Sequence, residues 1–305
     1  MSTDDDRPIN SIESPSERTL FPELGPCIKE KIKTYKRIEN PIWTEHKARF
    51  VQKYLQYFVQ ITKHGAYIDG FAGPQYFDKP DSWAAALVLE SEPKWLRRFF
   101  LCELGKRGIE ALEELARSQP ESHDKRGRSL PRSIQVLPGD FNINVERILS
   151  GGTITQKEAT FCLLDQRTFE CHWATLTKLA AYKQPPNNKI ELLYFLGVGW
   201  LHRAITAMHN KIILTRWWGN PEWTELMPKR VWEIAEVVRQ RFQNELGYRF
   251  SAAYPIFDKN AKGRIMYYMV HASDHEEAPA LMVRAHHKAV RELPREVQLS
   301  FPNPP

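Results

Sequence analysis

Apolar residues follow two alternating patterns along most of the chain, short unbroken runs and helical stripes. The unbroken runs are typical of strands that are buried on both faces, as in a parallel sheet. They predict five strands, at residues 66–69, 99–103, 133–137, 159–164 and 190–196. Helices are predicted between them, at about residues 105–118, 142–151 and 172–182. This alternation predicts an α/β fold with helices on both faces of the sheet.

The segments before and after this region differ from it. Thr44 is a candidate helix cap, and four apolar residues follow it with spacings of i, i+4, i+7 and i+8: Val51, Leu55, Phe58 and Val59. They predict an N-terminal amphipathic helix that ends near Gly65. After the fifth strand, a long helix is predicted at about 229–246. Two strand-like runs, 248–258 and 264–272, then meet across a short polar turn, which predicts a hairpin.

The predicted fold is therefore a Rossmann-like sheet of the class I methyltransferase type. It has five parallel strands closed by an antiparallel hairpin, with an N-terminal helical extension. Residues 1–27 are rich in Pro, Ser and acidic residues and are expected to form a loose arm. Residues 28–292 are expected to form a single domain, and 293–305 a Pro-rich tail. With no apolar run of about 18 residues and no signal-like N-terminus, we expect a cytoplasmic protein without membrane association.

Charge adds a candidate partner. The 43 Lys and Arg residues exceed the 37 Asp and Glu residues, which gives a net charge of +6 and a pI near 9.0. Basic residues gather between residues 28 and 53 and again in one loop, at Lys125, Arg126 and Arg128. Such clusters predict contact with the phosphate backbone of a nucleic acid. The alternative is an ordinary solvated face.

Metal and cysteine chemistry is not indicated. The four cysteines form no CxxC pair, and the histidines lack the close pair spacing of structural zinc sites, so no metal site is predicted. Cys171 is a candidate nucleophile only for cytosine-C5 chemistry, and no Pro-Cys elbow lies beside it. The reduced thiols agree with a reducing compartment.

Four acidic residues lie at or directly after the ends of successive predicted strands, where an open parallel sheet binds its ligands. They are Asp69, Glu103, Asp140 and Asp165. The first stands in a glycine-containing turn, Asp69-Gly70-Phe71-Ala72-Gly73, without a G-x-G-x-x-G run. This turn fits the methionine part of S-adenosylmethionine better than a pyrophosphate. Asp69, Phe71, Ala72 and Gly73 are therefore candidate cofactor residues.

The other strand ends complete the hypothesis. Glu103 is expected to accept hydrogen bonds from the ribose hydroxyls, and Asp140 from the adenine amino group, with Phe141 as an apolar wall. Asp165 would face the methyl acceptor as a catalytic residue, and Phe169 would stack on a flipped base. The alternative for each acid is a helix cap or a solvated turn.

Five segments resemble the three-Cys-motif partner protein (TcmP) family, in the family's order from about Thr44 to Met282. They are Tyr67-Ile68-Asp69-Gly70-Phe71-Ala72-Gly73-Pro74, Gly139-Asp140, Leu164-Asp165, Trp217-Trp218-Gly219-Asn220-Pro221-Glu222-Trp223 and His271-Ala272-Ser273-Asp274-His275. The resemblance implies a Rossmann-fold methyltransferase that binds S-adenosylmethionine. It also implies a partner with a three-cysteine cluster, a radical-type iron–sulfur protein.

Two departures from the family pattern leave an alternative open. Pro74-Gln75 follows Gly73, so one glycine of the turn is missing, and Asp165-Gln166-Arg167 lacks the prolines that amino-methyltransferases of nucleic acid use there. The leading hypothesis is a methyltransferase-like protein that acts on nucleic acid together with the iron–sulfur partner. The alternative is a non-catalytic adaptor on the same scaffold that binds nucleic acid or the partner. The tryptophans at 217, 218 and 223 are interpreted as core or lid packing, with stacking on bases as the alternative.

Overall fold

The computed structural model describes residues 42–120, 131–199, 201–257 and 265–291. The predicted N-terminal arm, the Pro-rich tail and the hairpin turn lie outside these residues. So do Lys125, Arg126 and Arg128.

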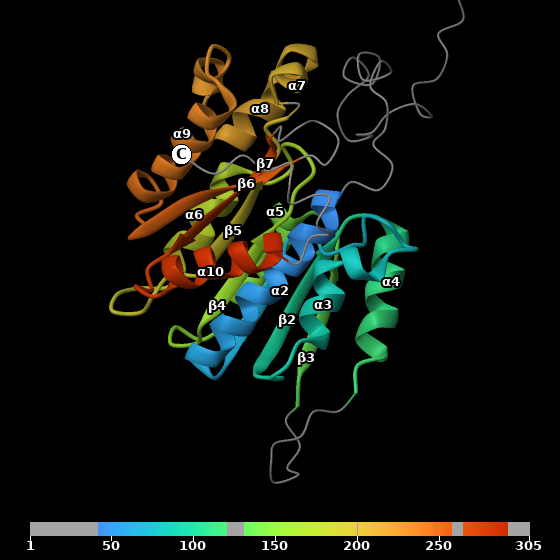
Figure 1. Ribbon diagram of the computed structural model, residues 1–305. Helices are drawn as coiled ribbons and strands as arrows, with labels where there is room; N and C mark the ends of the chain where they lie inside the picture. Colours follow the sequence, from blue (N-terminus) through green and yellow to red (C-terminus); the bar gives the residue numbers. More distant parts are fainter. Residues whose placement is uncertain (1–41, 121–130, 200, 258–264, 292–305) are drawn as a thin grey trace, which may run out of the picture.

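Seven strands form one sheet in the order β3-β2-β1-β4-β5-β7-β6 (Figure 1). The bounds of the strands are β1 Gly65–Asp69, β2 Leu96–Glu103, β3 Ser133–Pro138, β4 Thr160–Leu164, β5 Glu191–Leu196, β6 Phe250–Phe257 and β7 Ile265–Ser273. All seven were predicted from the apolar runs, with boundaries shifted by three residues or fewer.

The first five strands are parallel, and β7 runs antiparallel to both β5 and β6. Strand β1 lies in the middle, paired with β2 on one side and β4 on the other. The predicted set of parallel strands with an antiparallel hairpin is thus present. The antiparallel strand next to β5 distinguishes this mixed sheet from an all-parallel doubly wound one.

Helices cover both faces, and each face has its own apolar core. One face carries α2 (Ile42–Thr62), α3 (Ala84–Glu90), α4 (Lys106–Arg117) and α10 (Ala278–Arg291). The other carries α5 (Phe141–Ser150), α6 (Trp173–Ala181) and α9 (Val231–Asn244), with α7 (Leu201–Ala207) and α8 (Lys211–Trp218) beyond them. Within the described ranges, no helix is both long and apolar enough to cross a membrane.

Helix α2 confirms the amphipathic helix predicted before the first strand, but it already includes Ile42, so Thr44 lies inside the helix and is not its cap. Its apolar side chains Val51, Leu55 and Val59 are buried against the sheet. Helix α10, which the sequence analysis did not predict, contacts α2 on the same face (Figure 1). Helix α10 also contacts the edge strand β6.

The tryptophan-rich segment packs in the core. Trp217, Trp218 and Trp223 are 2%, 6% and 8% exposed. The Arg241 guanidinium lies 4.0 Å from the ring centre of Trp218 and 3.7 Å from that of Trp173. These rings therefore stabilise the fold and are not offered to bases, as the packing interpretation predicted.

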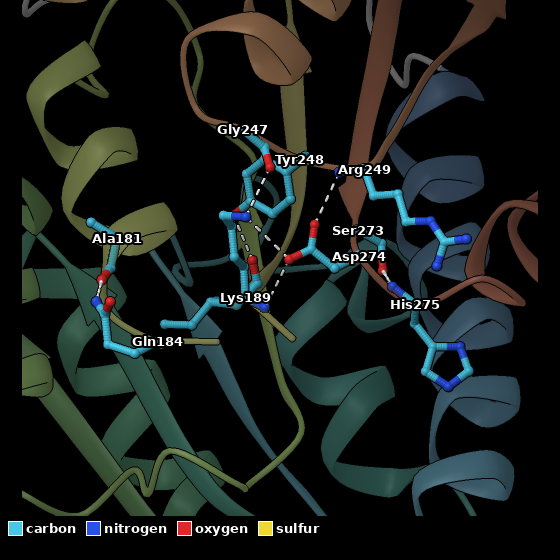
Figure 2. A network of polar contacts seen from close by, with 10 residues as sticks. Ala181, Gln184, Lys189, Gly247, Tyr248, Arg249, Ser273, Asp274 and His275 are labelled. Carbon is cyan, nitrogen blue, oxygen red and sulfur yellow. Dashed lines mark hydrogen bonds and ion pairs between the residues drawn. The ribbon is translucent and has the colours of Figure 1, made fainter. Parts of the chain in front are cut away.

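Ser273, Asp274 and His275, at the end of the His271–His275 segment, take part in a polar network at the edge of the sheet where β5 begins (Figure 2). Asp274 accepts hydrogen bonds from the backbone N–H groups of Lys189 and Arg249 at 3.2 and 3.0 Å, and pairs with the Lys189 ammonium at 3.2 Å. The Ser273 hydroxyl accepts from the His275 N–H at 3.1 Å. The network joins the start of β5 to the end of β7 and to the start of β6.

Beside it, Glu191 organises a buried polar cluster. Its carboxylate accepts hydrogen bonds from the Tyr54 and Ser273 hydroxyls, the latter at 2.7 Å, and His271 Nε2 lies 3.1 Å away. All four residues are 5% exposed or less. Helix α2 is therefore fixed to β5 and β7 by a shared carboxylate.

This cluster predicts a large stability loss on substitution. Glu191→Ala should lower the free energy of unfolding by about 3–5 kcal/mol, because the buried partners lose their common acceptor. Denaturant titration monitored by circular dichroism measures it. The control is Glu114→Ala on α4, an exposed carboxylate with a surface ion pair, which should change stability by less than about 0.5 kcal/mol. Equal stability of the two variants would contradict the structural role of Glu191.

Candidate functional site at the carboxyl edge of the sheet

The carboxyl ends of β1, β2, β3 and β4 meet at one edge of the sheet because these strands are parallel neighbours. Backbone hydrogen bonds join the segments that leave them. Gly70 donates to the Leu163 carbonyl at 3.0 Å, Ala72 to Cys102 at 2.8 Å, and Gly139 to Glu103 at 2.9 Å. The fold thus brings the four strand-end acids to the same edge, in the order 140, 103, 69 and 165.

Asp69 is enclosed in its own turn. One carboxylate oxygen accepts from the Tyr67 hydroxyl at 2.8 Å and the other from the Phe71 N–H at 3.1 Å. The side chain is buried, and burial together with the charges of Asp165 and Glu103 raises the pKa of Asp69 to about 7, although the two hydrogen bonds lower it. Near neutral pH this carboxyl is therefore poised between its protonated and ionised forms.

Glu103 connects the ends of β1 and β2. Its two oxygens accept backbone hydrogen bonds from Gly73 at 2.9 Å and from Gly105 at 2.7 Å. Each carboxylate oxygen retains a further lone pair. The arrangement holds the carboxylate in one orientation at the point where the sequence predicts ribose recognition.

Two glycines make this close packing feasible. A Cβ atom on Gly73 would lie 2.1 Å from Glu103 Oε2, and one on Gly70 would lie 2.9 Å from the Phe141 ring. The turn after β1 therefore has glycine where a carboxylate and an aromatic ring approach its backbone, although Pro74-Gln75 replaces a further glycine of the family pattern.

Asp140 and Phe141 begin α5. Asp140 is the exposed N-cap, and its side chain accepts from the Asn142 N–H at 2.8 Å. Asp140 therefore caps α5, which was the alternative that the sequence analysis left open. Phe141 is 2% exposed and packs in the core near Phe71, at 6.0 Å between ring centres. Its ring packs against Gly70 and Phe71 in the turn after β1.

Asp165 forms an ion pair with a residue from the distant N-terminal helix. Its Oδ1 lies 2.6 Å from the Lys47 ammonium, which also lies 3.7 Å from the ring centre of Phe195. The Lys47 side chain is 7% exposed and that of Asp165 25%. Burial lowers the pKa of Lys47, against the opposing effect of Asp165, and the charge of Arg167 lowers it further.

The loop after β4 is ordered by side chains, although it lacks prolines. Glu170 accepts from the backbone N–H groups of Arg167 and Thr168 at 2.6 and 3.1 Å, and Gln166 accepts from that of Cys171 at 2.9 Å. Asn142 on α5 donates to the Glu170 carbonyl at 2.8 Å. These bonds do locally what prolines would do by restricting the backbone.

Phe169 does not fit the predicted stacking role. It is 3% exposed and contacts the Trp217 ring edge-to-face at 4.8 Å between centres. Its ring therefore belongs to the apolar core on the face of the sheet that α5 and α6 cover. A base placed against Asp165 would need another stacking partner.

Cysteine and metal chemistry find no support at this edge. Cys171 is buried, and burial raises the pKa of its thiol well above the ordinary range, which disfavours a nucleophilic thiolate. Among the described residues, no group of three or more His, Cys, Asp or Glu side chains is arranged to hold a metal ion.

The sequence analysis missed Lys47 as a site residue. Its signal was available, because Lys47 lies four residues before Val51 and eight before Leu55 and so continues the apolar stripe of the predicted helix. A lysine on a buried face needs a charged partner. The identity of that partner, 118 residues away, was not readable from the spacing.

Comparisons with known proteins leave family membership open. No family model and no curated protein matches the chain. One similar solved structure is that of protein LPL1258 from Legionella pneumophila str. Philadelphia 1, titled with the family model DUF519. It is 10% identical, covers 81% of this chain and 90% of its own, and has a TM-score of 0.46. A likeness at this level assigns neither family nor function, and the resemblance to TcmP proteins stays a prediction.

The raised pKa of Asp69 predicts a pH-dependent stability. Between pH 4 and pH 8 the unfolded chain loses a proton from this carboxyl before the folded chain does, so stability falls as pH rises. The difference between about 7 and the ordinary aspartate pKa of 3.8 corresponds to roughly 4 kcal/mol. Relative to wild type, Asp69→Asn should therefore gain up to that amount in free energy of unfolding from pH 4 to pH 8, measured by urea titration.

The exposed Asp78→Asn is the matched control and should follow wild type throughout. A constant difference between Asp69→Asn and wild type across this range would show that Asp69 ionises normally in the folded protein.

Proposed function

We propose that the chain binds S-adenosylmethionine at the carboxyl edge of the sheet and acts as a methyltransferase. The observation that carries the proposal is the Glu103 carboxylate, fixed by the N–H groups of Gly73 and Gly105 directly beside the turn after β1. A carboxylate at the end of the second strand is suited to accept hydrogen bonds from two adjacent ribose hydroxyls.

The order of strands supports the same proposal. The strand order β3-β2-β1-β4-β5-β7-β6, in which β7 alone runs opposite to the other six strands, is the layout of class I methyltransferases. The strand order reverses between β1 and β4, and such a switch point is where open α/β sheets bind ligands.

The side chains at this edge fit the cofactor chemically. Asp69, with its pKa near 7, would be ionised by a nearby cationic amino or sulfonium group. Leu104, directly after Glu103, is 72% exposed, and Ile143, in the first turn of α5, is 66% exposed. Large exposed apolar side chains beside a polar site are suited to cover the faces of an adenine.

In this proposal the cofactor supplies an electrophilic methyl group, and the protein supplies alignment. Asp69, Phe71, Ala72 and Gly73 would hold the methionine part, Glu103 the ribose and Asp140 the adenine amino group. Phe141 supports the turn. Asp165, a quarter exposed after β4, would orient the acceptor. Nucleic acid as the acceptor and the three-cysteine iron–sulfur protein as the partner come from the basic composition and the family resemblance.

One observation favours a second candidate, a non-catalytic adaptor that binds nucleic acid or the partner. Asp165 is already paired with Lys47, and Phe169 is buried. The loop after β4 therefore lacks the free carboxylate and the exposed aromatic ring that the acceptor turn of an amino-methyltransferase presents. In an adaptor, the residues at the carboxyl edge either still bind the cofactor or serve only to stabilise the fold.

Calorimetric titration with S-adenosylmethionine and S-adenosylhomocysteine tests cofactor binding. Wild type should bind both, and Glu103→Ala should weaken binding at least roughly tenfold, because each lost hydrogen bond costs about 1–3 kcal/mol. Glu110→Ala, an exposed carboxylate on the neighbouring α4, is the control and should bind as wild type does. No binding to wild type would refute the proposal, and unchanged affinity of folded Glu103→Ala would place the pocket elsewhere.

Asp165→Asn separates the enzyme from the adaptor. The asparagine can still accept from Lys47, so the fold and the affinity for S-adenosylmethionine should persist. Methyl transfer from radiolabelled cofactor to nucleic acid or to the partner should fall by roughly 100-fold or more, because the acceptor loses its orienting carboxylate. Transfer that is undiminished in this variant, or absent in cofactor-bound wild type, would favour the adaptor.

A further inference from the structure

Lys47 and Asp165 form an asymmetric ion pair. The ammonium is enclosed, with 7% of its side chain exposed, while the carboxylate retains 25% exposure and only its Oδ1 atom is occupied by the lysine. One oxygen is thus held from inside the protein, and the other carboxylate oxygen has no hydrogen bond of its own among the described residues.

The surroundings fix the lysine in place. Its ammonium lies 3.7 Å from the ring centre of Phe195 at the end of β5 and 5.5 Å from that of Tyr267 on β7. Cation–π contact and the ion pair together offset the cost of burying the charge. The long side chain therefore has little freedom, and so does the carboxylate it holds.

The pair also sets the local charge. Lys47 cancels the charge of Asp165, and Arg167 on the same loop adds a positive charge close enough to lower the pKa of Lys47. A cationic amine bound to Asp165 would lie beside the Lys47 ammonium, which is 2.6 Å from the same carboxylate and repels a second cation, while a neutral donor group could still bond to the carboxylate.

We propose that Lys47 is a positioning residue that holds Asp165 for a neutral N–H donor, such as the exocyclic amino group of a nucleobase, and disfavours the cationic amine of a protein lysine. This inference rests on the proposed function. The nitrogen lone pair forms the bond to the methyl carbon, the carbon–sulfur bond breaks with its electrons left on sulfur, and the N–H proton passes to water. Asp165 orients the nitrogen during this step.

The test compares two acceptors with radiolabelled S-adenosylmethionine: a single-stranded oligonucleotide that contains adenine and cytosine, and a lysine-containing peptide. Wild type should methylate the oligonucleotide much faster than the peptide. Lys47→Met should lower kcat on the oligonucleotide by roughly 100-fold with little change in KM, because the carboxylate loses its fixed orientation. It should also lower the ratio of the oligonucleotide rate to the peptide rate.

Two variants guard against a merely structural effect. Lys47→Arg retains the charge and should recover most of the lost kcat, and Lys178→Met removes a solvated lysine on α6 and should behave as wild type. Wild-type kcat and an unchanged acceptor ratio in Lys47→Met would overturn the inference. So would transfer to the peptide rather than to the oligonucleotide by wild type, or transfer to neither with cofactor bound.

A measurement without catalysis tests the pair itself. In protein labelled with ¹³C-lysine, with the Lys47 signal identified by its loss in Lys47→Arg, Lys47 should titrate below the usual lysine range. It should titrate lower still in Asp165→Asn, because the favourable negative charge is gone. A Lys47 pKa in the usual lysine range that does not change in Asp165→Asn would overturn the pairing. If calorimetry shows no cofactor binding, the proposed function fails independently, and this titration still decides whether Lys47 holds Asp165.

Discussion

The parallel pairing of β1 with both β2 and β4 is the constraint on which the candidate site depends. Because these strands run in the same direction, the residues that follow them emerge at one edge, and Asp69, Glu103 and Asp165 become neighbours despite long separations along the chain. Glu103 then fastens this edge by accepting the N–H groups of Gly73 and Gly105. A side chain on Gly73 would displace that carboxylate, so the glycine and the acid act as one unit.

The polar side chains at the two edges of the sheet differ in how fully the fold itself satisfies their hydrogen bonds. At the edge where β5 begins, hydroxyl donors of the fold bind Glu191, and N–H and ammonium donors bind Asp274. Figure 2 shows the Asp274 contacts. At the carboxyl edge, Asp165 remains a quarter exposed, Leu104 is largely exposed, and burial has raised the pKa of Asp69. Groups that the fold satisfies stabilise it, whereas groups left with unused capacity are available to a ligand. This contrast is why the site is proposed at the carboxyl edge.

The loop after β4 shows how one structural task can be met in two ways. Prolines would restrict the backbone directly, and here Glu170, Gln166 and Asn142 restrict it through hydrogen bonds. The departure from the family pattern therefore does not leave the loop without local order. It does change what the loop presents, since Phe169 turns into the core and Asp165 is held by Lys47.

The sequence by itself determined the seven strands, the amphipathic helix before them and the acids at the strand ends, because burial on both faces imposes a pattern that neighbouring residues reveal. It also placed the tryptophans in the core. Only the tertiary structure decided the partners: Lys47 for Asp165, Glu191 for Tyr54 and His271, and Trp217 for Phe169. Such pairs depend on which distant elements the fold brings together. Local spacing can show that a buried lysine needs a counter-charge, but not which carboxylate supplies it.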